Sequence, residues 1–254
     1  MAAFDSGGLT LAYDEIGVRE SGRPVILVHG FSSNRNENWR RLGWYGAFER
    51  KGLRFAALDC RGHGESAKPH DPADYARDKM AGDVFALMDH LGAPRADLLG
   101  YSMGARIVLA AALAHPERVP MVIAGGIGGR LFEPALQGNP MADAMDADDP
   151  AGIAEPMLRS FRQFADEQGE DRKALAACAR AAYPPFTREM LSGLQMPTLI
   201  VAGSRDELAG DPKVLAAAIP GARAVTLPAC DHFSAISHGL FKGTVIDFLE
   251  GVLE

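Results

Sequence analysis

The sequence predicts an α/β protein with a mostly parallel central sheet, helices on both faces of the sheet and a helical cap inserted between two strands. Short apolar runs alternate with longer amphipathic ones over residues 25–125 and again near the C-terminus, as strand–helix–strand units require. The stretch between these two parts contains no strand-like run. We therefore predict a core of residues 1–125 and 196–254, and a cap of residues 126–195 inserted in the same domain.

Length and composition fit this architecture and exclude some classes of partner. The chain has 254 residues, of which 47% are hydrophobic and 23% charged, near the averages of globular proteins. There are 26 lysines and arginines against 33 acidic residues, for a net charge of −7. Such a chain has no general basic field to neutralise phosphates or anionic lipid, so we expect no nucleic-acid or membrane partner.

The cysteines and the first residues predict a cytoplasmic location. Cys60, Cys178 and Cys230 are odd in number and lack the C-x-x-C spacing of zinc or redox sites. We expect free thiols in a reducing compartment. The N-terminal residues do not resemble a secretory signal, and no later apolar run reaches the roughly 18 residues of a membrane span.

Each predicted core strand is a short apolar run. The candidates are residues 25–28, 55–58, 96–99, 121–124, 197–202 and 222–227. Residues 9–13 are flanked by glycines and predict a strand in an antiparallel edge of the sheet.

Helices are predicted between these strands and in the insertion. Apolar residues recur at helical spacing over 80–91, and Gly92 is suited to end that helix. Residues 107–114 are small or apolar on every side, which predicts a helix buried against the sheet. The other predicted helices are 157–164, 174–182 and, from about His238 to Leu253, an amphipathic C-terminal helix.

The segment Gly100–Gly104 is a G-x-S-x-G motif between a predicted strand and the buried helix. A nucleophile on such a turn needs small neighbours because the backbone is strained there, and the turn lifts the Ser102 hydroxyl out of the sheet. The start of the helix stabilises developing negative charge. The alternative is that Ser102 is an ordinary N-cap between packing glycines.

A serine nucleophile needs a base, and seven histidines compete for that role. His232 follows the last predicted strand on a short loop, so it lies at the same carboxyl edge of the sheet as Ser102. His238 is the second candidate, but it begins the last helix and would need to reach back. His29 and His63 lie in turns, and His90 and His115 lie near helix ends.

The third group is a carboxylate that orients the histidine. Asp206 lies in the loop after strand 197–202, at the same sheet edge, and Glu207 is the second candidate. Asp231 adjoins His232 in sequence and points elsewhere on an extended loop, so we expect a capping or ion-pairing role for it. The alternative for Asp206 is a turn residue of the Asx type.

Two backbone N–H groups are needed to bind the oxyanion of a tetrahedral intermediate. We predict the amide of Met103, which follows the nucleophile, and the amide of Phe31 in the loop after strand 25–28. Gly30 allows the sharp turn that aims the Phe31 amide inward. His29 is then expected to be structural, with its ring bonded to loop backbone.

Five segments together resemble the α/β-hydrolase superfamily, over essentially the whole chain. They are His29-Gly30-Phe31, Asp59–Ser66, Gly100–Gly104, Gly203–Asp206 and Asp231-His232. The chain is similar in particular to compact bacterial serine esterases and enol-lactonase-like members with a helical cap between the sixth and seventh strands.

The resemblance implies hydrolysis through an acyl-enzyme, with Ser102 as nucleophile, His232 as base, Asp206 as its orienting acid and no metal or organic cofactor. It implies that Asp59–Ser66 is a structural turn. Haloalkane dehalogenase and epoxide hydrolase relatives carry aspartate at the position of Ser102, so we do not expect those two chemistries.

The substrate is predicted to be a small or medium-sized carboxylic ester held in an apolar pocket. The expected wall residues are Phe31, Tyr101, Met103, Met157, Leu158, Phe161 and Phe233. Arg35 lies in a polar stretch, residues 32–39, for which we expect a solvated surface loop. An alternative role for Arg35 is contact with an acidic group of the substrate.

Two other functions remain open from the sequence. A lactonase, thioesterase, carbon–carbon bond hydrolase or perhydrolase would use the same three residues and differ only in pocket shape. A small-molecule-binding protein could keep the fold and lose turnover. The sequence does not determine the oligomeric state.

Overall fold

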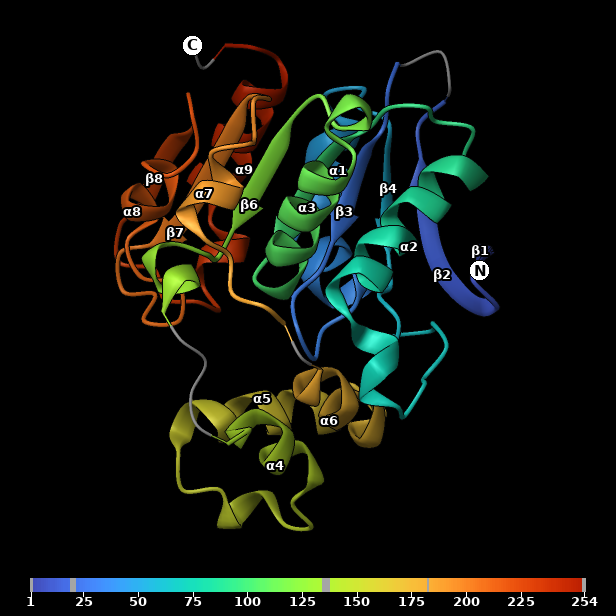
Figure 1. Ribbon diagram of the computed structural model, residues 1–254, viewed down its shortest axis with the longest axis vertical. Coiled ribbons are helices and arrows are strands. Elements are labelled where there is room, and N and C mark those ends of the chain that lie inside the picture. Colours follow the sequence, from blue (N-terminus) through green and yellow to red (C-terminus); the bar gives the residue numbers. More distant parts are fainter. Residues whose placement is uncertain (1, 19–21, 134–137, 182, 253–254) are drawn as a thin grey trace.

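The computed structural model describes residues 2–18, 22–133, 138–181 and 183–252. Its centre is an eight-stranded sheet with helices on both faces, and a separate lobe of helices lies at one end of the sheet (Figure 1). This architecture confirms the predicted fold class. Within the described ranges, no helix is long and apolar enough to cross a membrane.

The sheet runs in the order β1-β2-β4-β3-β5-β6-β7-β8. Its strands are β1 (Ala2–Ser6), β2 (Leu9–Ile16), β3 (Val25–Val28), β4 (Phe55–Leu58), β5 (Asp97–Tyr101), β6 (Val122–Gly125), β7 (Thr198–Gly203) and β8 (Arg223–Leu227). From β4 to β8 all neighbours pair in parallel, whereas β2 pairs antiparallel with both β1 and β4. The predicted antiparallel edge is therefore confirmed. Strand β1 was not predicted, because its sequence AAFDS is largely exposed and forms no continuous apolar run.

The central strands are apolar throughout because both of their faces are covered. Along β3, Ile26 and Val28 pack in one hydrophobic cluster, and Val25 and Leu27 pack in a second cluster on the opposite face. This alternation follows from the two-residue period of a strand.

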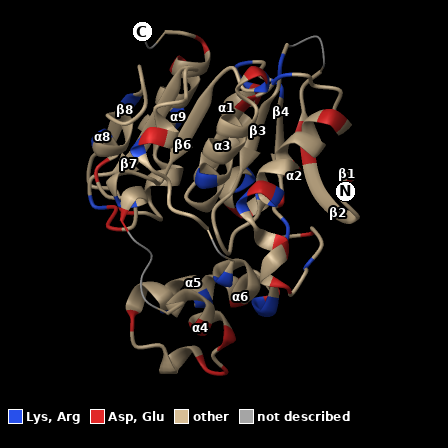
Figure 2. Cartoon of the chain, viewed as in Figure 1, with Lys and Arg blue, Asp and Glu red and all other residues tan. Residues whose placement is uncertain are grey.

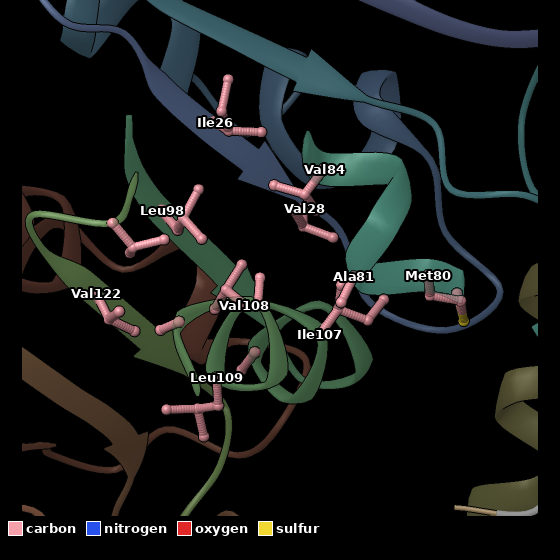
Figure 3. Close-up of a cluster of buried hydrophobic side chains, with 14 of the residues drawn as sticks. Ile26, Val28, Met80, Ala81, Val84, Leu98, Ile107, Val108, Leu109 and Val122 are labelled. Atoms are coloured by element: carbon pink, nitrogen blue, oxygen red, sulfur yellow. The ribbon is translucent and has the colours of Figure 1, made fainter. Parts of the chain in front are cut away.

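Two helices cover each face of the central strands. On one face are α2 (Arg77–His90) and α3 (Met103–Ala114), and on the other are α1 (Trp44–Glu49) and α9 (Gly239–Leu249). Figure 3 shows side chains of α2 and α3, including Val84 and Val108, converging on strand residues such as Leu98. A short helix, α8 (Pro212–Ala216), packs against β7 and β8.

Two predicted helix ends can be compared with the structure. Gly92 has φ +62°, and its N–H donates to the Asp89 carbonyl (3.0 Å) just after α2, as expected for a glycine that ends a helix. The C-terminal helix stops at Leu249, and the predicted end at Leu253 lies outside the described residues.

Between β6 and β7 the described residues form helices and no strand. Three of them, α4 (Pro140–Asp146), α5 (Pro156–Glu167) and α6 (Arg172–Arg180), pack around a hydrophobic cluster of their own, and we call them the helical lobe. The predicted helix 174–182 corresponds to α6, and Ala182 lies outside the described residues. A fourth helix, α7 (Arg188–Leu191), lies beside the sheet (Figure 1).

The lobe has polar ends and a polar connection to the core. Side chains of Asn139, Glu155 and Asp171 cap α4, α5 and α6 by accepting backbone N–H groups of the first turns. Glu170 accepts from the Gly64 amide (2.9 Å) and from the Asn34 side chain (3.1 Å), both in the core. Figure 2 shows acidic residues on the loops of the lobe farthest from the sheet.

The polar segment after β3 is buried, and the prediction of a solvated loop is wrong. The chain forms a helical turn over Asn36–Arg40, and Trp39 is fully buried. Arg35 is 8% exposed, and its guanidinium pairs with the carboxylates of Asp14, Asp59 and Glu65. Three carboxylates from remote segments therefore neutralise the arginine, and it is not available to a substrate.

Candidate active site

Ser102 occupies a strained turn between β5 and α3. Its φ of +55° and ψ of −110° lie where residues with a Cβ are rarely found. A Cβ on Gly100 would be 2.2 Å from the Gly104 carbonyl oxygen, and a Cβ on Gly104 would be 2.0 Å from the Val28 oxygen. Both glycines of the motif are thus required by close backbone approach.

The structure brings Ser102, His232 and Asp206 together in one chain of hydrogen bonds. Ser102 Oγ lies 2.9 Å from Nε2 of His232, and Nδ1 of His232 lies 3.0 and 2.9 Å from the two carboxylate oxygens of Asp206. His232 and Asp206 are buried, whereas Ser102 is partly accessible. With the Nδ1 proton donated to Asp206, Nε2 is free to accept the serine proton.

Asp206 is held in place by its own loop after β7. Its Oδ1 also accepts the backbone N–H groups of Leu208 (3.1 Å) and Ala209 (2.9 Å). The predicted alternative, an Asx-type turn residue, is therefore also realised, and the same carboxylate both orders the loop and faces the histidine.

His232 is held by the loop after β8. The Tyr101 hydroxyl donates to the His232 carbonyl oxygen at 2.5 Å, and the two rings lie 5.5 Å apart. Burial raises the pKa of Tyr101 well above its usual value, so the hydroxyl stays a neutral donor. We expected only a wall residue at Tyr101; it also positions the loop of His232.

The other candidate acids and bases lie elsewhere. The ring of His238 accepts the Leu240 amide and caps α9, and Glu207 is exposed. Asp231 accepts the backbone N–H groups of Phe233 and Ser234, the capping role expected from the sequence.

His29 and His63 form a buried pair beneath the loop that carries Phe31. His29 donates from Nδ1 to the Gly30 carbonyl (2.8 Å) and accepts the Cys60 amide at Nε2 (3.0 Å), the structural role expected from the sequence. The two rings lie 5.2 Å apart. Burial lowers the pKa of His29 to about 4 and that of His63 to about 3, so both rings are neutral at pH 7.

The two predicted oxyanion donors belong to residues close to the serine. Gly30 approaches the elbow so closely that a Cβ there would be 3.5 Å from Ser102 Cβ, and the next residue, Phe31, lines both cavities together with Ser102. Met103 is the first residue of α3. In the part of the chain that the structure describes, neither the Phe31 nor the Met103 N–H has a hydrogen-bond partner. Both donors are therefore free for a ligand.

Two cavities meet at Ser102 and His232. Cavity A, about 540 Å³, lies between the loop after β3, α5 and the loop after β8. Cavity B, about 400 Å³, lies between α2, α3 and the helical lobe. Volumes in this range suit small-molecule ligands.

The predicted wall residues divide between these cavities. Phe31 and Phe161 line both, Tyr101 and Phe233 line cavity A, and Met103 lines cavity B. Met157 and Leu158 line neither, and this part of the prediction is not supported. Met157 packs against the hydrophobic cluster of the lobe, to which Phe161 also belongs.

Two lining residues were missed in the sequence. Arg77 at the start of α2 and Arg106 on α3 both line cavity B. A usable signal was present for Arg106, a charged residue four positions after Ser102 in an otherwise apolar helix. Among the described residues, no three His, Cys, Asp or Glu side chains gather as metal ligands would.

Comparison with known proteins gives matches over most of the chain. The family model described as alpha/beta hydrolase fold matches residues 23–164. The chain is 33% identical over 240 residues to the dihydrolipoyllysine-residue acetyltransferase component of the acetoin cleaving system of Pseudomonas putida, covering 89% of this chain and 62% of that protein. The chain thus spans less than two thirds of that relative's length.

Two further matches are enol-lactonases. The chain is 29% identical over 206 residues to 3-oxoadipate enol-lactonase 2 of Acinetobacter baylyi, covering 74% of this chain and 73% of the lactonase. The solved enol-lactonase of Burkholderia xenovorans LB400 superimposes with a TM-score of 0.72 at 27% identity, covering 98% of this chain and 100% of that one.

Proposed function

The chain belongs to the alpha/beta hydrolase fold family, and on that premise we propose that it is a serine hydrolase of small to medium-sized carboxylic esters. Ser102 would be the nucleophile, His232 the general base and acid, and Asp206 the residue that orients the histidine. The proposal depends above all on one observation, the continuous hydrogen bonding from Ser102 Oγ through His232 to the Asp206 carboxylate.

In the acylation step, Nε2 of His232 takes the proton of Ser102 as Oγ attacks the carbonyl carbon of the ester. The negative charge moves to the carbonyl oxygen, where the amides of Phe31 and Met103 would bind it. When the tetrahedral intermediate collapses, the bond to the alcohol breaks, and His232 gives its proton to the leaving oxygen. The acyl group then stays on Ser102.

In the deacylation step, water takes the place of the alcohol. His232 removes one proton from the water as its oxygen attacks the acyl carbon, and then returns that proton to Ser102 Oγ. The carboxylic acid is released and the enzyme is regenerated. Every proton in this cycle passes through Nε2, so Asp206 must hold Nδ1 protonated throughout.

The two cavities support a two-part substrate with its scissile bond at Ser102. One part of the ester would occupy cavity A and the other cavity B, and the helical lobe would act as the cap over both. Phe31 and Phe161 contact both cavities, with ring centroids 6.2 Å apart, so they would bound the reacting centre.

A lactone is the second candidate substrate, favoured by the similarity to two enol-lactonases. A cyclic ester passes through the same steps, except that the leaving oxygen remains attached to the acyl group. Both substrates require the same three residues, so they differ only in what the cavities accept.

The test is the hydrolysis of p-nitrophenyl esters from acetate to long acyl chains, together with a panel of simple lactones. We expect turnover of the shorter esters or of a lactone, and a loss of at least about a thousandfold in Ser102→Ala. Asp206→Asn should lose about 10⁴-fold in kcat because the histidine takes the wrong tautomer. Glu207→Gln, on the same loop but exposed, is the matched control and should retain full activity.

A ligand-binding protein without turnover gives a different result. In that case neither esters nor lactones would be hydrolysed faster by the wild type than by Ser102→Ala, and the proposal would be wrong. A fluorophosphonate probe that labels the wild type but not Ser102→Ala would show independently that Oγ is activated.

A further inference from the structure

Cavity B contains two arginines and no acidic residue among its described lining. Arg77 and Arg106 stand among apolar side chains such as Met80, Ile107 and Phe161. Cavity A differs in charge, since its described lining includes Glu37 and Glu167 and neither lysine nor arginine. The two sides of Ser102 are therefore electrostatically distinct.

Arg106 has no charge partner in the described part of the chain. Its guanidinium makes no ion pair or hydrogen bond there, and the two titratable groups that act on its pKa are Arg77 and Tyr183. The surrounding protein desolvates the guanidinium and, with the charge of Arg77, lowers its pKa. Arg106 is nevertheless an exposed residue, so its desolvation is partial, as expected for a side chain at the open face of cavity B.

Arg77 is held in place without being neutralised. Its guanidinium donates to the Pro184 carbonyl and lies 4.1 Å from the ring centroid of Phe186 and 5.9 Å from that of Tyr183. Within the described residues it has no carboxylate partner. The carbonyl and the rings orient this cation and leave its charge uncompensated.

Two uncompensated cations side by side are unfavourable in a partly desolvated site. The buried arginines Arg61 and Arg35 have acidic partners: Arg61 pairs with Asp83, and Arg35 with Asp59. The pair in cavity B departs from that pattern, and an anionic ligand would supply the missing charge.

The position of Arg106 relates this charge to the reaction. It lies on α3, four residues after Ser102, and its N–H donates to the Ser102 carbonyl (3.3 Å). One helical turn separates the two residues along the axis, about 6 Å. A group bound at Arg106 would thus be only a few bonds from a carbonyl attacked by Ser102.

We propose that cavity B is a carboxylate subsite, and that the substrates of this protein are esters or lactones carrying a carboxylate a few carbons from the scissile carbonyl. Arg106 and Arg77 bind that carboxylate, and the uncharged remainder of the substrate faces cavity A. The proposal rests on the hydrolase function above and narrows its substrate class.

The test compares acidic and neutral esters of matched length. The mono-4-nitrophenyl esters of adipate, pimelate and suberate place a carboxylate in the acyl group, and the 4-nitrophenyl esters of the corresponding straight-chain monoacids are their neutral counterparts. A second pair, 4-acetoxybenzoate and 4-methylphenyl acetate, places the carboxylate in the leaving group. The quantity measured is the ratio of kcat/KM for the acidic ester to that for its neutral counterpart.

We expect the wild type to prefer the acidic member of at least one pair, and Arg106→Gln to lower that ratio by about 10- to 100-fold, the effect of losing a charge-assisted hydrogen bond. Arg77→Gln should lower the ratio less, because one N–H group of the Arg77 guanidinium already donates to the Pro184 carbonyl. Arg223→Gln, on the exposed edge strand β8, removes the same charge and should leave the ratio unchanged.

Stability provides a second readout that a structural arginine would not give. The Arg106 guanidinium has no ion pair or hydrogen bond to lose within the described residues, so Arg106→Met should not lower the melting temperature of the free protein. A fall in melting temperature would mean that Arg106 supports the fold, and would contradict the proposal.

Failure of this proposal can be told apart from failure of the proposed function. If kcat/KM is the same for neutral and acidic esters, and Arg106→Gln leaves every ratio unchanged, the carboxylate subsite is wrong while the hydrolase function stands. If no ester or lactone is hydrolysed, the hydrolase function is wrong. The subsite is then tested by calorimetric titration of suberate into Ser102→Ala. Binding that is lost when Arg106→Gln is added to this variant supports an anion site. The absence of binding to Ser102→Ala overturns the proposed subsite.

Discussion

Gly203 and Cys230 approach each other so closely that a Cβ on the glycine would be 2.1 Å from the cysteine carbonyl oxygen. The same carbonyl accepts the Arg205 amide at 2.8 Å. This contact joins the two loops that carry the acid and the base. Asp206 lies three residues after Gly203, and His232 lies two residues after Cys230. The Asp206–His232 distance therefore depends on backbone packing as well as on the two side chains.

The first prediction concerns this contact. Gly203→Ala should cost about 1–3 kcal/mol of stability because the loops must separate, and it should lower kcat by about a hundredfold through displacement of the acid from the histidine. Thermal unfolding and ester kinetics measure the two effects. Gly243→Ala, in α9 with no atom within 4 Å of the added carbon, should instead stabilise the protein by about 0.5–1 kcal/mol.

A second prediction concerns the buried ion network of Arg35. Arg35→Met should cost about 3–5 kcal/mol because it leaves the Asp59 carboxylate buried without its cation. Chemical denaturation measures this cost. Arg41→Met removes a pair with Glu37 in which the arginine side chain is 65% exposed, and it should change stability by less than about 0.5 kcal/mol. Were Arg35→Met to leave stability unchanged and raise KM for acidic esters alone, Arg35 would be a substrate ligand after all.

The third prediction separates two residues of one helix. Phe161→Ala enlarges both cavities and should shift the preferred acyl chain toward longer esters. Met157→Ala, one helical turn away on α5, should leave the chain-length profile unchanged because Met157 lines neither cavity and packs in the lobe. Profiles of kcat/KM against chain length for both variants provide the comparison, and an identical shift in the two would contradict this division.

The fourth prediction is a loss of stability in mild acid. His29 and His63 have pKa values lowered by burial to about 4 and about 3, below the value of about 6.5 expected in the unfolded chain. The unfolded chain therefore binds more protons as the pH falls below 6.5, and stability that is complete above that pH is progressively lost. From pH 7 to pH 5 each histidine should contribute a loss of about 2 kcal/mol.

The measurement is the free energy of unfolding in urea at pH 7, 6 and 5. His63→Gln should be less stable at pH 7 but show a smaller decrease toward pH 5, while His115→Gln, at an exposed histidine, should keep the slope of the wild type. Burial raises the pKa values of Glu170 and Asp59, so these groups act in the opposite direction. An unchanged slope in His63→Gln would show that His63 is not responsible.

Most of the fold followed from local patterns. The central strands were readable because a parallel strand covered on both faces must be apolar at every position. The elbow was readable because the close approach of Gly100 and Gly104 permits no other residue. Ser102, Asp206 and His232 could be proposed because each follows a strand that ends at the same edge of the sheet.

The sequence by itself thus determined the class of fold, the positions of the core strands and the identity of Ser102, His232 and Asp206, which the structure brings together. Tertiary structure alone decided that Arg35 is neutralised by three remote carboxylates, that Phe161 and not Met157 reaches the cavities, and that Arg77 and Arg106 share one of them. The reason is physical: periodicity states which face of an element is buried, but the neighbours on that face come from segments distant in sequence. For a charged residue, those neighbours decide whether it is an internal ion pair or a binding site.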